Sequence, residues 1–224
     1  MEQNINEYPS LDIRLEDKHL IVLNKPAGIG SQPDKTEDVS LLALAEAHCR
    51  CTLHPIHRID RPATGLVVFA KTPTAAASLS RQFQERTVEK TYWAVVPPPP
   101  APEGTLVHFL KKNTKTNKST VFETEQPGTE RAELHYREIG KSQRYCLLEI
   151  TLITGRHHQI RAQLAAMGCP IKGDVKYGAR RSNPDRSIFL HAVRLAFEHP
   201  LLGSRVELEV MPSFYGIFDS SFSH

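Results

Sequence analysis

The segment from His57 to Ala70 places the strongest constraint on how this chain folds. Residues 66–70 (Leu-Val-Val-Phe-Ala) form an unbroken apolar run, whose length and branched and aromatic side chains predict a buried strand. Pro62 and Gly65 interrupt the chain just before this run, which indicates a loop. We therefore expect Asp60 to lie in a loop held by the end of a rigid strand.

Two arginines flank Asp60 in the sequence. Arg58 and Arg61 favour the anion, because nearby positive charge lowers a carboxyl pKa below its ordinary value of about 3.9. Asp60 is therefore predicted to be ionised at neutral pH. Two interpretations follow: a salt bridge that ties down the strand end, which is common in proteins, or a carboxylate ready for chemistry. The residues alone leave both open.

The composition is that of an ordinary globular protein. The chain has 224 residues, 40% of them hydrophobic and 24% charged, which suits one large domain or two closely joined lobes. No apolar run approaches the roughly 18 residues that span a bilayer, so no membrane partner is expected. The polar, acidic residues 1–10 resemble neither a signal peptide nor a transit peptide, and we predict a cytoplasmic protein.

The four cysteines are too few and too scattered to form a disulfide framework. One cluster suggests an alternative, a zinc-dependent protein, because two thiols and two imidazoles fall within nine positions: Cys49, Cys51, His54 and His57. Their spacing is not one that structural zinc sites usually have. The prediction is therefore that the protein holds no metal.

Positive charge is unevenly distributed, although the formal net charge is only +3. Clustered cations on loops are expected where a partner carries phosphates. Three groups stand out: Lys111, Lys112, Lys115 and Lys118; Arg156 and Arg161; and Arg180, Arg181 and Arg186. For the lysine group alone, a solvated surface loop is the better interpretation.

Hydrophobic periodicity predicts few helices and many strands. Helices are expected over residues 41–48, 72–86 and 160–167, with Asp38 or Ser40 capping the first and Thr72 capping the second. Strands are expected over residues 11–15, 20–24, 66–70, 90–96, 106–110, 119–123, 132–139, 146–152, 188–197 and 206–210. Four strands in succession without intervening helices imply antiparallel pairing. The fold class is therefore α+β, with a mixed, largely antiparallel sheet and flanking helices.

Several large enzyme classes are excluded by their missing motifs. The sequence has no Gly-rich phosphate loop, no His-Glu-x-x-His zinc site and no Gly-x-Ser-x-Gly turn. What remains is the anionic Asp60, an aromatic-rich strand that contains Tyr92, and a helix that begins with arginines. Such a set could form a pocket for a flat, flipped-out base joined to phosphates.

Five segments, in order, resemble the RluA-type pseudouridine synthases. His57–Gly65 is similar to the family signature H-R-L-D-x-x-T-S-G. The other segments are Lys25–Gly28 (K-P-x-G), Lys90–Ala94 (K-x-Y-x-A), Gly155–Arg161 (G-R-T-H-Q-I-R), and Pro170–Asp174 with Tyr177–Gly178 (P-I-x-G-D-x-x-Y-G). Leu190-His191-Ala192 also matches the family's L-H-A. The resemblance extends from about residue 17 to residue 212. The departures are few: Ile59, Ala63-Thr64, and one of the two adjacent histidines, which stands where the family has threonine.

The resemblance implies the pseudouridine synthase fold, with a central RNA-binding cleft, and the isomerisation of uridine in RNA to pseudouridine. Asp60 would be the nucleophile or electrostatic partner at the sugar. Tyr92 would stack on the uracil, and its hydroxyl would assist proton removal. Arg161 would pair with Asp60, and Arg58 would help to displace the target base. Because the reaction rejoins atoms of one substrate, neither a redox cofactor nor a metal is required.

The remaining expectations concern substrate binding and organisation. Arg156 is expected to bind substrate, Leu190 is either core or the floor beneath the base, and Lys25 is either a phosphate contact or a strand-end charge. Residues 1–10 are predicted to be a tail and residues 11–224 the catalytic domain, without a separate N-terminal RNA-binding module. Recognition of ribosomal or transfer RNA would then involve the 111–118 hairpin, in a monomer with no obligatory protein partner. The alternative is an RNA-binding or RNA-folding protein with a vestigial site.

Overall fold

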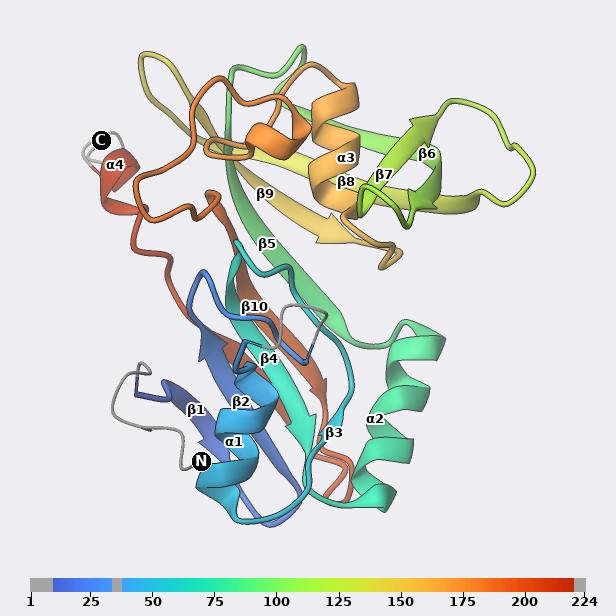
Figure 1. Cartoon of the computed structure of the whole chain (residues 1–224), viewed down its shortest axis with the longest axis vertical. Coiled ribbons are helices and arrows are strands. Elements are labelled where there is room, and N and C mark those ends of the chain that lie inside the picture. Colours follow the sequence, from blue (N-terminus) through green and yellow to red (C-terminus); the bar gives the residue numbers. More distant parts are fainter. Residues whose placement is uncertain (1–9, 34–37, 220–224) are drawn as a thin grey trace.

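In the part of the chain that the structure describes, one sheet of 11 strands joins the two halves of the molecule (Figure 1). The computed structural model describes residues 10–33 and 38–219, so the predicted tail lies outside the described residues except for Ser10. The strands are β1 (Ile13–Glu16), β2 (Leu20–Lys25), β3 (His54–Pro55), β4 (Thr64–Ala70), β5 (Glu89–Val96), β6 (Glu103–Asn113), β7 (Lys118–Phe122), β8 (Glu130–Lys141), β9 (Cys146–Leu152), β10 (Leu190–Glu198) and β11 (Arg205–Glu209). The helices are α1 (Leu41–Cys49), α2 (Pro73–Glu85), α3 (Gln159–Ala166), the one-turn η2 (Val175–Tyr177) and α4 (Gly216–Asp219).

The order of the strands confirms the predicted fold class. The sheet runs β1-β2-β4-β10-β5-β9-β8-β6-β7, with β11 beside β10 and β3 beside β4. Among the described strands, β4 and β10 pair in parallel, and the other pairings are antiparallel. The four successive strands β6 to β9 are linked by antiparallel pairs, as expected. In Figure 1, the long strand β5 passes from one half of the molecule to the other, alongside β10.

The apolar runs in β2 and β4 are continuous because both faces of this part of the sheet are covered. Side chains alternate between the two faces of a strand. Ile21, Leu23, Val67 and Phe69 pack into the core on the side of α1, and Leu20, Val22, Leu66 and Val68 pack into a second core on the side of α2. All eight side chains are at most 1% exposed. The rigid strand predicted behind Asp60 is thus confirmed.

Both predicted helix caps are present. The Ser40 hydroxyl accepts a hydrogen bond from the Ala43 amide, and the Thr72 hydroxyl accepts one from the Ala75 amide, each 3.2 Å long. The short elements β3, η2 and α4 were not predicted, because two to four residues carry no periodic signal. The strand predicted from residue 188 begins at Leu190, since residues 188 and 189 bond to neighbouring loops and to β5.

The lysine-rich segment is only partly the hairpin tip that was predicted. Lys111 and Lys112 lie in β6, where they pair with Thr120 and Ser119, and residues 114–117 form the turn. The strand continues past residue 110 because the cross-strand pairing with β7 continues. None of the helices in the described parts of the chain is long and apolar enough to cross a membrane.

Gly65 provides a sharp test of the pairing between β4 and β10. Its φ is +114°, and a Cβ atom at this position would lie 2.4 Å from the carbonyl oxygen of Ala192. We expect Gly65→Ala to lower the free energy of unfolding by about 3 kcal/mol or more, because it combines backbone strain with a clash against backbone atoms. Urea unfolding measures the loss.

Gly168→Ala is the matched control. Gly168 also has a positive φ (+84°), but apart from its chain neighbours no atom of the described residues lies within 4 Å of the place that a Cβ atom would take. The free energy of unfolding of this variant should fall by only about 1–2 kcal/mol. Equal losses in the two variants would contradict the close approach of β4 to β10.

Candidate active site

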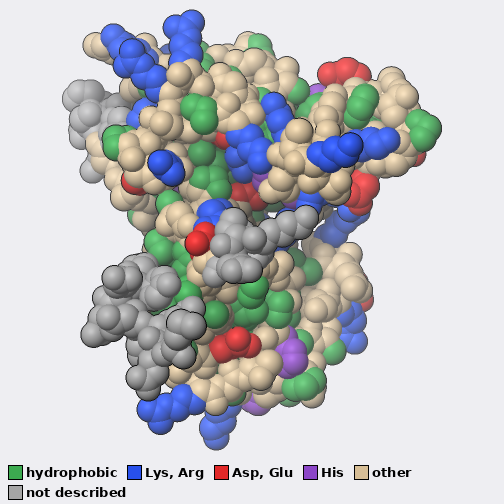
Figure 2. Space-filling model, in the orientation of Figure 1, with side chains coloured by type: hydrophobic (Ala, Val, Ile, Leu, Met, Phe, Trp, Pro, Cys, Tyr) green, Lys and Arg blue, Asp and Glu red, His purple; other side chains and the backbone are tan. Residues whose placement is uncertain are grey.

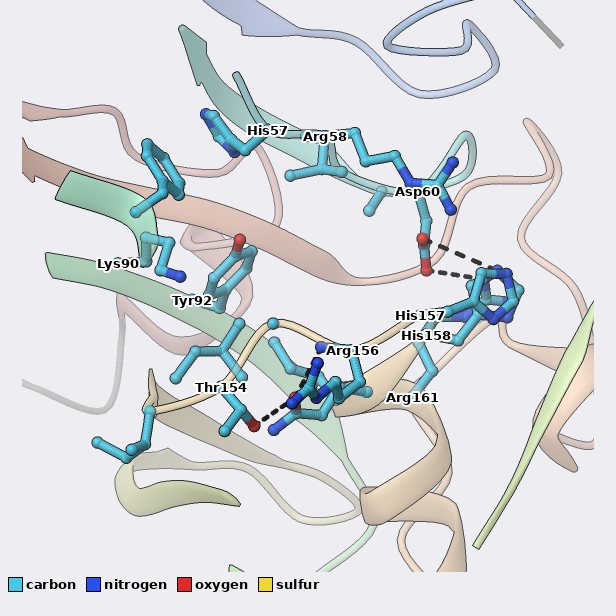
Figure 3. A pocket seen from close by; sticks show the side chains of 18 of the residues that line it. His57, Arg58, Asp60, Lys90, Tyr92, Thr154, Arg156, His157, His158 and Arg161 are labelled. Atoms are coloured by element: carbon cyan, nitrogen blue, oxygen red, sulfur yellow. Dashed lines mark hydrogen bonds and ion pairs between the residues drawn. The ribbon is translucent and has the colours of Figure 1, made fainter. Parts of the chain in front are cut away.

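A single cavity of about 690 Å³ brings together most of the residues expected to act (Figure 3). Its walls come from the loop before β4, from α2, β5 and β10, and from the segment that leads into α3. Six of the seven predicted residues line it: Arg58, Asp60, Tyr92, Arg156, Arg161 and Leu190. In the space-filling view, Lys and Arg side chains gather beside the hollow between the two halves, over the β6–β7 hairpin and the segments next to α3 (Figure 2).

Backbone hydrogen bonds fix the loop that carries Asp60. The Ser31 hydroxyl donates to the Ile59 carbonyl and accepts from the Ile59 amide, at 2.9 and 3.1 Å. The amide of Gly28 donates to the carbonyl of Arg61, and the amide of Ala63 donates to the carbonyl of Asp60. Hydrogen bonds therefore hold the backbone on both sides of Asp60, and its side chain lines the cavity.

Arg161 lies between two carboxylates. Its Nε and Nη2 donate to Oδ2 and Oδ1 of Asp174, at 2.7 and 2.9 Å, and its Nη1 donates to Oδ2 of Asp60, at 2.9 Å. The side chain of Arg161 is 4% exposed and that of Asp174 is 1% exposed. A planar guanidinium that is fixed by two bonds on one side presents its remaining donor in a defined direction. Asp174 thus aims Arg161 at Asp60.

Asp60 is held in its ionised form. Burial by itself would raise its pKa, but the charge of Arg161 and the hydrogen bond from Arg161 help to lower it below its ordinary value. Burial also lowers the pKa of His158 to about 3, so this ring is neutral at pH 7. The charge that stabilises the Asp60 anion is therefore that of Arg161.

The pKa of Asp60 is lowered as predicted, and the pairing with Arg161 that the resemblance implied is present, but the flanking arginines are not among the main causes of the lowering. The flanking Arg61 points away and forms an ion pair with Asp38, 2.7 Å from Nη1 to Oδ2. Arg58 lines the cavity without an ion pair to Asp60 (Figure 3). Neighbours in sequence need not be neighbours across a turn, and the effective cation comes from position 161.

Tyr92 stands on β5, opposite Ile150 of β9 and Ala192 of β10, and is 8% exposed. Its ring lines the same cavity as Asp60. Burial and the nearby charge of Asp60 raise the pKa of its hydroxyl. The phenol is therefore protonated at neutral pH and acts as a hydrogen-bond donor in this state, which disfavours the predicted help with proton removal.

Arg58, Arg156 and Leu190 occupy different parts of the cavity wall. Arg156 is anchored by its Nε to the Arg131 carbonyl, at 3.1 Å, and by Nη1 to the Glu130 carboxylate, at 2.6 Å. Leu190 is 5% exposed and lies at the start of β10, facing the cavity beside Tyr92. Both interpretations of Leu190, core residue and cavity floor, are thus compatible with its position.

Lys25 is not a phosphate contact, and it is not a plain strand-end charge. Its side chain is 0% exposed, and its ammonium donates to the carbonyls of Pro26, Ile29 and Arg61 at 2.8, 2.9 and 3.1 Å. Burial lowers its pKa to about 7, although the charge of Asp60 opposes this shift. Lys25 ties the end of β2 to the loop of Asp60, so its effect on the site is structural.

The zinc alternative has no support in the geometry. Among the described residues, no three His, Cys, Asp or Glu side chains are grouped so that they could hold a metal ion. The Nε2 atom of His57 instead accepts a hydrogen bond from the Val68 amide, at 3.1 Å, and its ring stacks on Phe83. Burial and the charge of Lys90 lower the pKa of His57 to about 3.

Three residues of the site had been given no role on the basis of the sequence. Asp174 was noted only as part of a motif, yet two hydrogen bonds from Arg161 to its carboxylate fix the guanidinium. His158 faces Asp60, with 3.8 Å between Nε2 and Oδ1. Lys90 lines the cavity, and its ammonium lies over the ring of Phe83. The signal for Lys90 and Asp174 was their place inside recognised motifs, two residues before Tyr92 and thirteen after Arg161.

Comparison with known proteins settles the family. The family model described as RNA pseudouridylate synthase matches residues 19–166. The chain belongs to this family. It is 33% identical to the uncharacterized RNA pseudouridine synthase YhcT of Bacillus subtilis, over 92% of this chain and 70% of that protein. It is 30% identical to tRNA pseudouridine synthase C of Vibrio parahaemolyticus, over 89% of each chain.

Solved structures agree with the fold of this pseudouridine synthase. The human RNA pseudouridylate synthase domain containing 4 superposes with a TM-score of 0.73 and 25% identity, over 92% of this chain and 90% of that one. The human RNA pseudouridylate synthase domain containing 1 gives a TM-score of 0.77 at 23% identity, over 96% and 87%. The enzyme is an isomerase that converts uridine in RNA to pseudouridine.

Replacing Lys25 with methionine tests its structural assignment. Lys25→Met leaves three carbonyls without their buried donor, and each unsatisfied group costs about 1–3 kcal/mol. We expect the free energy of unfolding to fall by about 3 kcal/mol, while the affinity of the folded enzyme for RNA is unchanged. Urea unfolding and RNA titration measure the two effects. Weaker RNA binding with unchanged stability would show instead that Lys25 contacts a phosphate of the RNA.

A second prediction separates the charge of Arg161 from its packing. Arg161→Gln leaves Asp60 buried without a cation, so its pKa rises and the acid limb of kcat/KM moves to higher pH. We expect kcat to fall about 100-fold. The variant should also lose about 3–5 kcal/mol of stability, because Asp174 is left as an unpaired buried charge.

The double variant Arg161→Gln/Asp174→Asn is the control. It removes the unpaired charge and should recover most of the stability, but not the activity. Activity that returns together with stability would mean that Arg161 acts only through packing.

Proposed function

We propose that this pseudouridine synthase isomerises a specific uridine in ribosomal or transfer RNA, with Asp60 as the group that attacks the sugar. The observation that carries the proposal is the ionised Asp60 carboxylate, which shares one cavity with Tyr92 and is bonded to Arg161. A carboxylate can trap or stabilise positive charge at the anomeric carbon only when it is deprotonated. The positive charge of Arg161 favours this deprotonated state of Asp60.

The proposed reaction balances within one nucleotide. A carboxylate oxygen of Asp60 bonds to C1′ while the N1–C1′ bond breaks, and uracil leaves with the electron pair. The base turns in the cavity, and its C5 then bonds to C1′ as the bond to Asp60 breaks. The C5 hydrogen leaves as a proton, and N1 gains one. No electrons are exchanged with another molecule, so the reaction as written needs neither a redox cofactor nor a metal.

The proposed roles of Tyr92, Leu190 and Arg58 concern the flipped base. Tyr92 gives an aromatic face for the uracil, and its protonated hydroxyl is a donor for a carbonyl of the base. Leu190 forms the apolar floor of this part of the cavity. Arg58 has no ion pair with Asp60, and at the cavity wall it is placed to enter the stack that the base leaves.

Cations around the cavity are proposed to bind the RNA backbone. Arg156 and Lys90 line the wall, and the β6–β7 hairpin adds exposed lysines. Clustered cations of this kind bind phosphates and make affinity depend on salt. Lys90→Ala should therefore weaken binding for all RNA sequences alike.

Both kinds of RNA in this proposal come from the names of relatives. One is named for the large ribosomal subunit (pseudouridine synthase D of Zymomonas mobilis, 33% identical) and another for tRNA (pseudouridine synthase C of Vibrio parahaemolyticus). Because all the residues proposed for the chemistry come from one chain, we propose a monomer that needs no protein partner. Its proposed location is the cytoplasm, where these RNAs are found.

Release of the C5 hydrogen gives the decisive assay. With RNA that carries tritium at C5 of uridine, the enzyme should release tritium, and Asp60→Asn should abolish the release while it keeps RNA affinity within about threefold, because Asp60 acts on the reacting bond and not on phosphates. Lys90→Ala is the contrasting variant, with weaker binding and a smaller loss of turnover.

An RNA-binding protein with a vestigial site would behave differently. It would release no tritium from any cellular RNA, and Asp60→Asn would then be indistinguishable from the unmodified chain. That result would overturn the proposed function.

A further inference from the structure

His158 has a backbone conformation that is costly for its residue type. It is the N-cap of α3, with φ +53° and ψ +28°, in the left-handed region. Its side chain makes no capping hydrogen bond to the helix. A residue other than glycine in this region costs about 1–2 kcal/mol and persists where its surroundings require it. The side chain of His158 is used for something other than starting the helix.

The imidazole lies between Tyr177 and Asp60. Its Nδ1 atom is 3.0 Å from the Tyr177 hydroxyl, and its Nε2 atom is 3.8 Å from Oδ1 of Asp60. The other oxygen of Asp60 is already bonded to Arg161. The two oxygens of Asp60 therefore face two different groups, a cation and an imidazole (Figure 3).

The hydrogen bonds of Tyr177 define which nitrogen of His158 carries the hydrogen. The Tyr177 oxygen accepts a hydrogen bond from the Ser119 amide, at 2.8 Å, so its own hydrogen is available for His158 Nδ1. A neutral imidazole with an accepting Nδ1 carries its hydrogen on Nε2. The hydrogen then points towards Asp60.

Several features keep the ring neutral and fixed. The His158 side chain is 8% exposed, and burial lowers its pKa to about 3. The groups that face it are Asp60, which raises the pKa, and Arg161, His157 and Lys176, which lower it further. The ring of His157 stacks on it with 3.8 Å between centroids, and His157 is itself bonded to Ser119 of β7.

We propose that His158 is a positioning residue for the isomerisation: its neutral Nε2–H faces Oδ1 of Asp60 and limits where this oxygen moves, while Arg161 holds Oδ2. The inference rests on the proposed role of Asp60. A distance of 3.8 Å is longer than a hydrogen bond, so Oδ1 is not locked. A second cation here would lower the reactivity of the anion, whereas a neutral donor orients it and leaves its charge in place.

Two substitutions at this position form a matched pair. Asparagine tolerates a left-handed backbone, but its amide is too short to reach Asp60. Glutamine places an amide N–H close to the position of Nε2. We expect His158→Asn to lower the single-turnover rate about 10–100-fold with RNA affinity within about twofold, and His158→Gln to recover most of that loss. Urea unfolding checks that both variants are folded.

Two outcomes would overturn the proposal. One is a His158→Asn enzyme with an unchanged rate. The other is an equal loss of rate and affinity that glutamine does not rescue, which would indicate a direct contact with RNA. If Asp60→Asn is inactive while both His158 variants are fully active, the proposed function stands and this inference fails.

Nuclear magnetic resonance of the free enzyme tests the inference without any activity. The ¹⁵N shifts of the His158 ring distinguish the two neutral tautomers and the imidazolium. We expect the Nε2–H tautomer at pH 7, and a loss of this preference in Tyr177→Phe. The Nδ1–H tautomer or a charged ring in the unmodified enzyme would overturn the assignment.

Discussion

The bridge that Arg161 forms between Asp174 and Asp60 is the interaction on which the site depends. Two carboxylates compete for one guanidinium, and their burial differs: Asp174 is 1% exposed and Asp60 is 20% exposed. Asp174 takes two donors and fixes the plane of the guanidinium, and Asp60 takes one. One guanidinium cannot neutralise two carboxylates, and the remaining negative charge of this cluster lies on the more exposed carboxylate. Asp174 is the carboxylate that fixes Arg161, and Asp60 is the one that faces the cavity.

The sheet makes this bridge possible by bringing distant segments together. Asp60 precedes β4, Tyr92 lies on β5, and β10 runs between these two strands. The pairing of His191 and Ala192 with both β4 and β5 fixes the separation of Asp60 and Tyr92 across one strand. Helix α3 then follows β9, the next neighbour of β5, and its first turn delivers Arg161. Residues 60, 92 and 161 meet because the strands are staggered: through β10 the start of β4 is level with Trp93, the end of β9 is level with Thr91, and Tyr92 lies between these two levels.

Much of the fold and of the site could be predicted from the sequence, and the predictions that were wrong share a cause. Apolar runs and capping residues predicted the strands and helices, because those signals are local. The ordered motifs identified Asp60, Tyr92 and Arg161. Lys25 was misjudged because a lysine at the end of a strand gives no sign that three carbonyls will surround it. Arg61 was misjudged in the same way, since the direction of a side chain in a loop depends on contacts such as Asp38 that are distant in sequence. In both cases the position of the side chain is set by contacts with residues distant in the sequence, which the residue type alone does not reveal.

The cations and rings of the site differ in their burial and in the groups around them, and these differences set the charge that each of them carries. Lys25 and Arg161 are both buried, but Lys25 is surrounded by neutral carbonyls and its pKa falls to about 7, whereas Arg161 is bonded to two carboxylates and its pKa rises. Arg58 and Lys90 face the open cavity, where a phosphate can still reach them. Burial likewise keeps His158 neutral beside an anion. The fixed positive charge of Arg161 thus lies on one side of the Asp60 carboxylate. In the proposed reaction this leaves the other side to the substrate, because a cation there would compete with the anomeric carbon for the same oxygen.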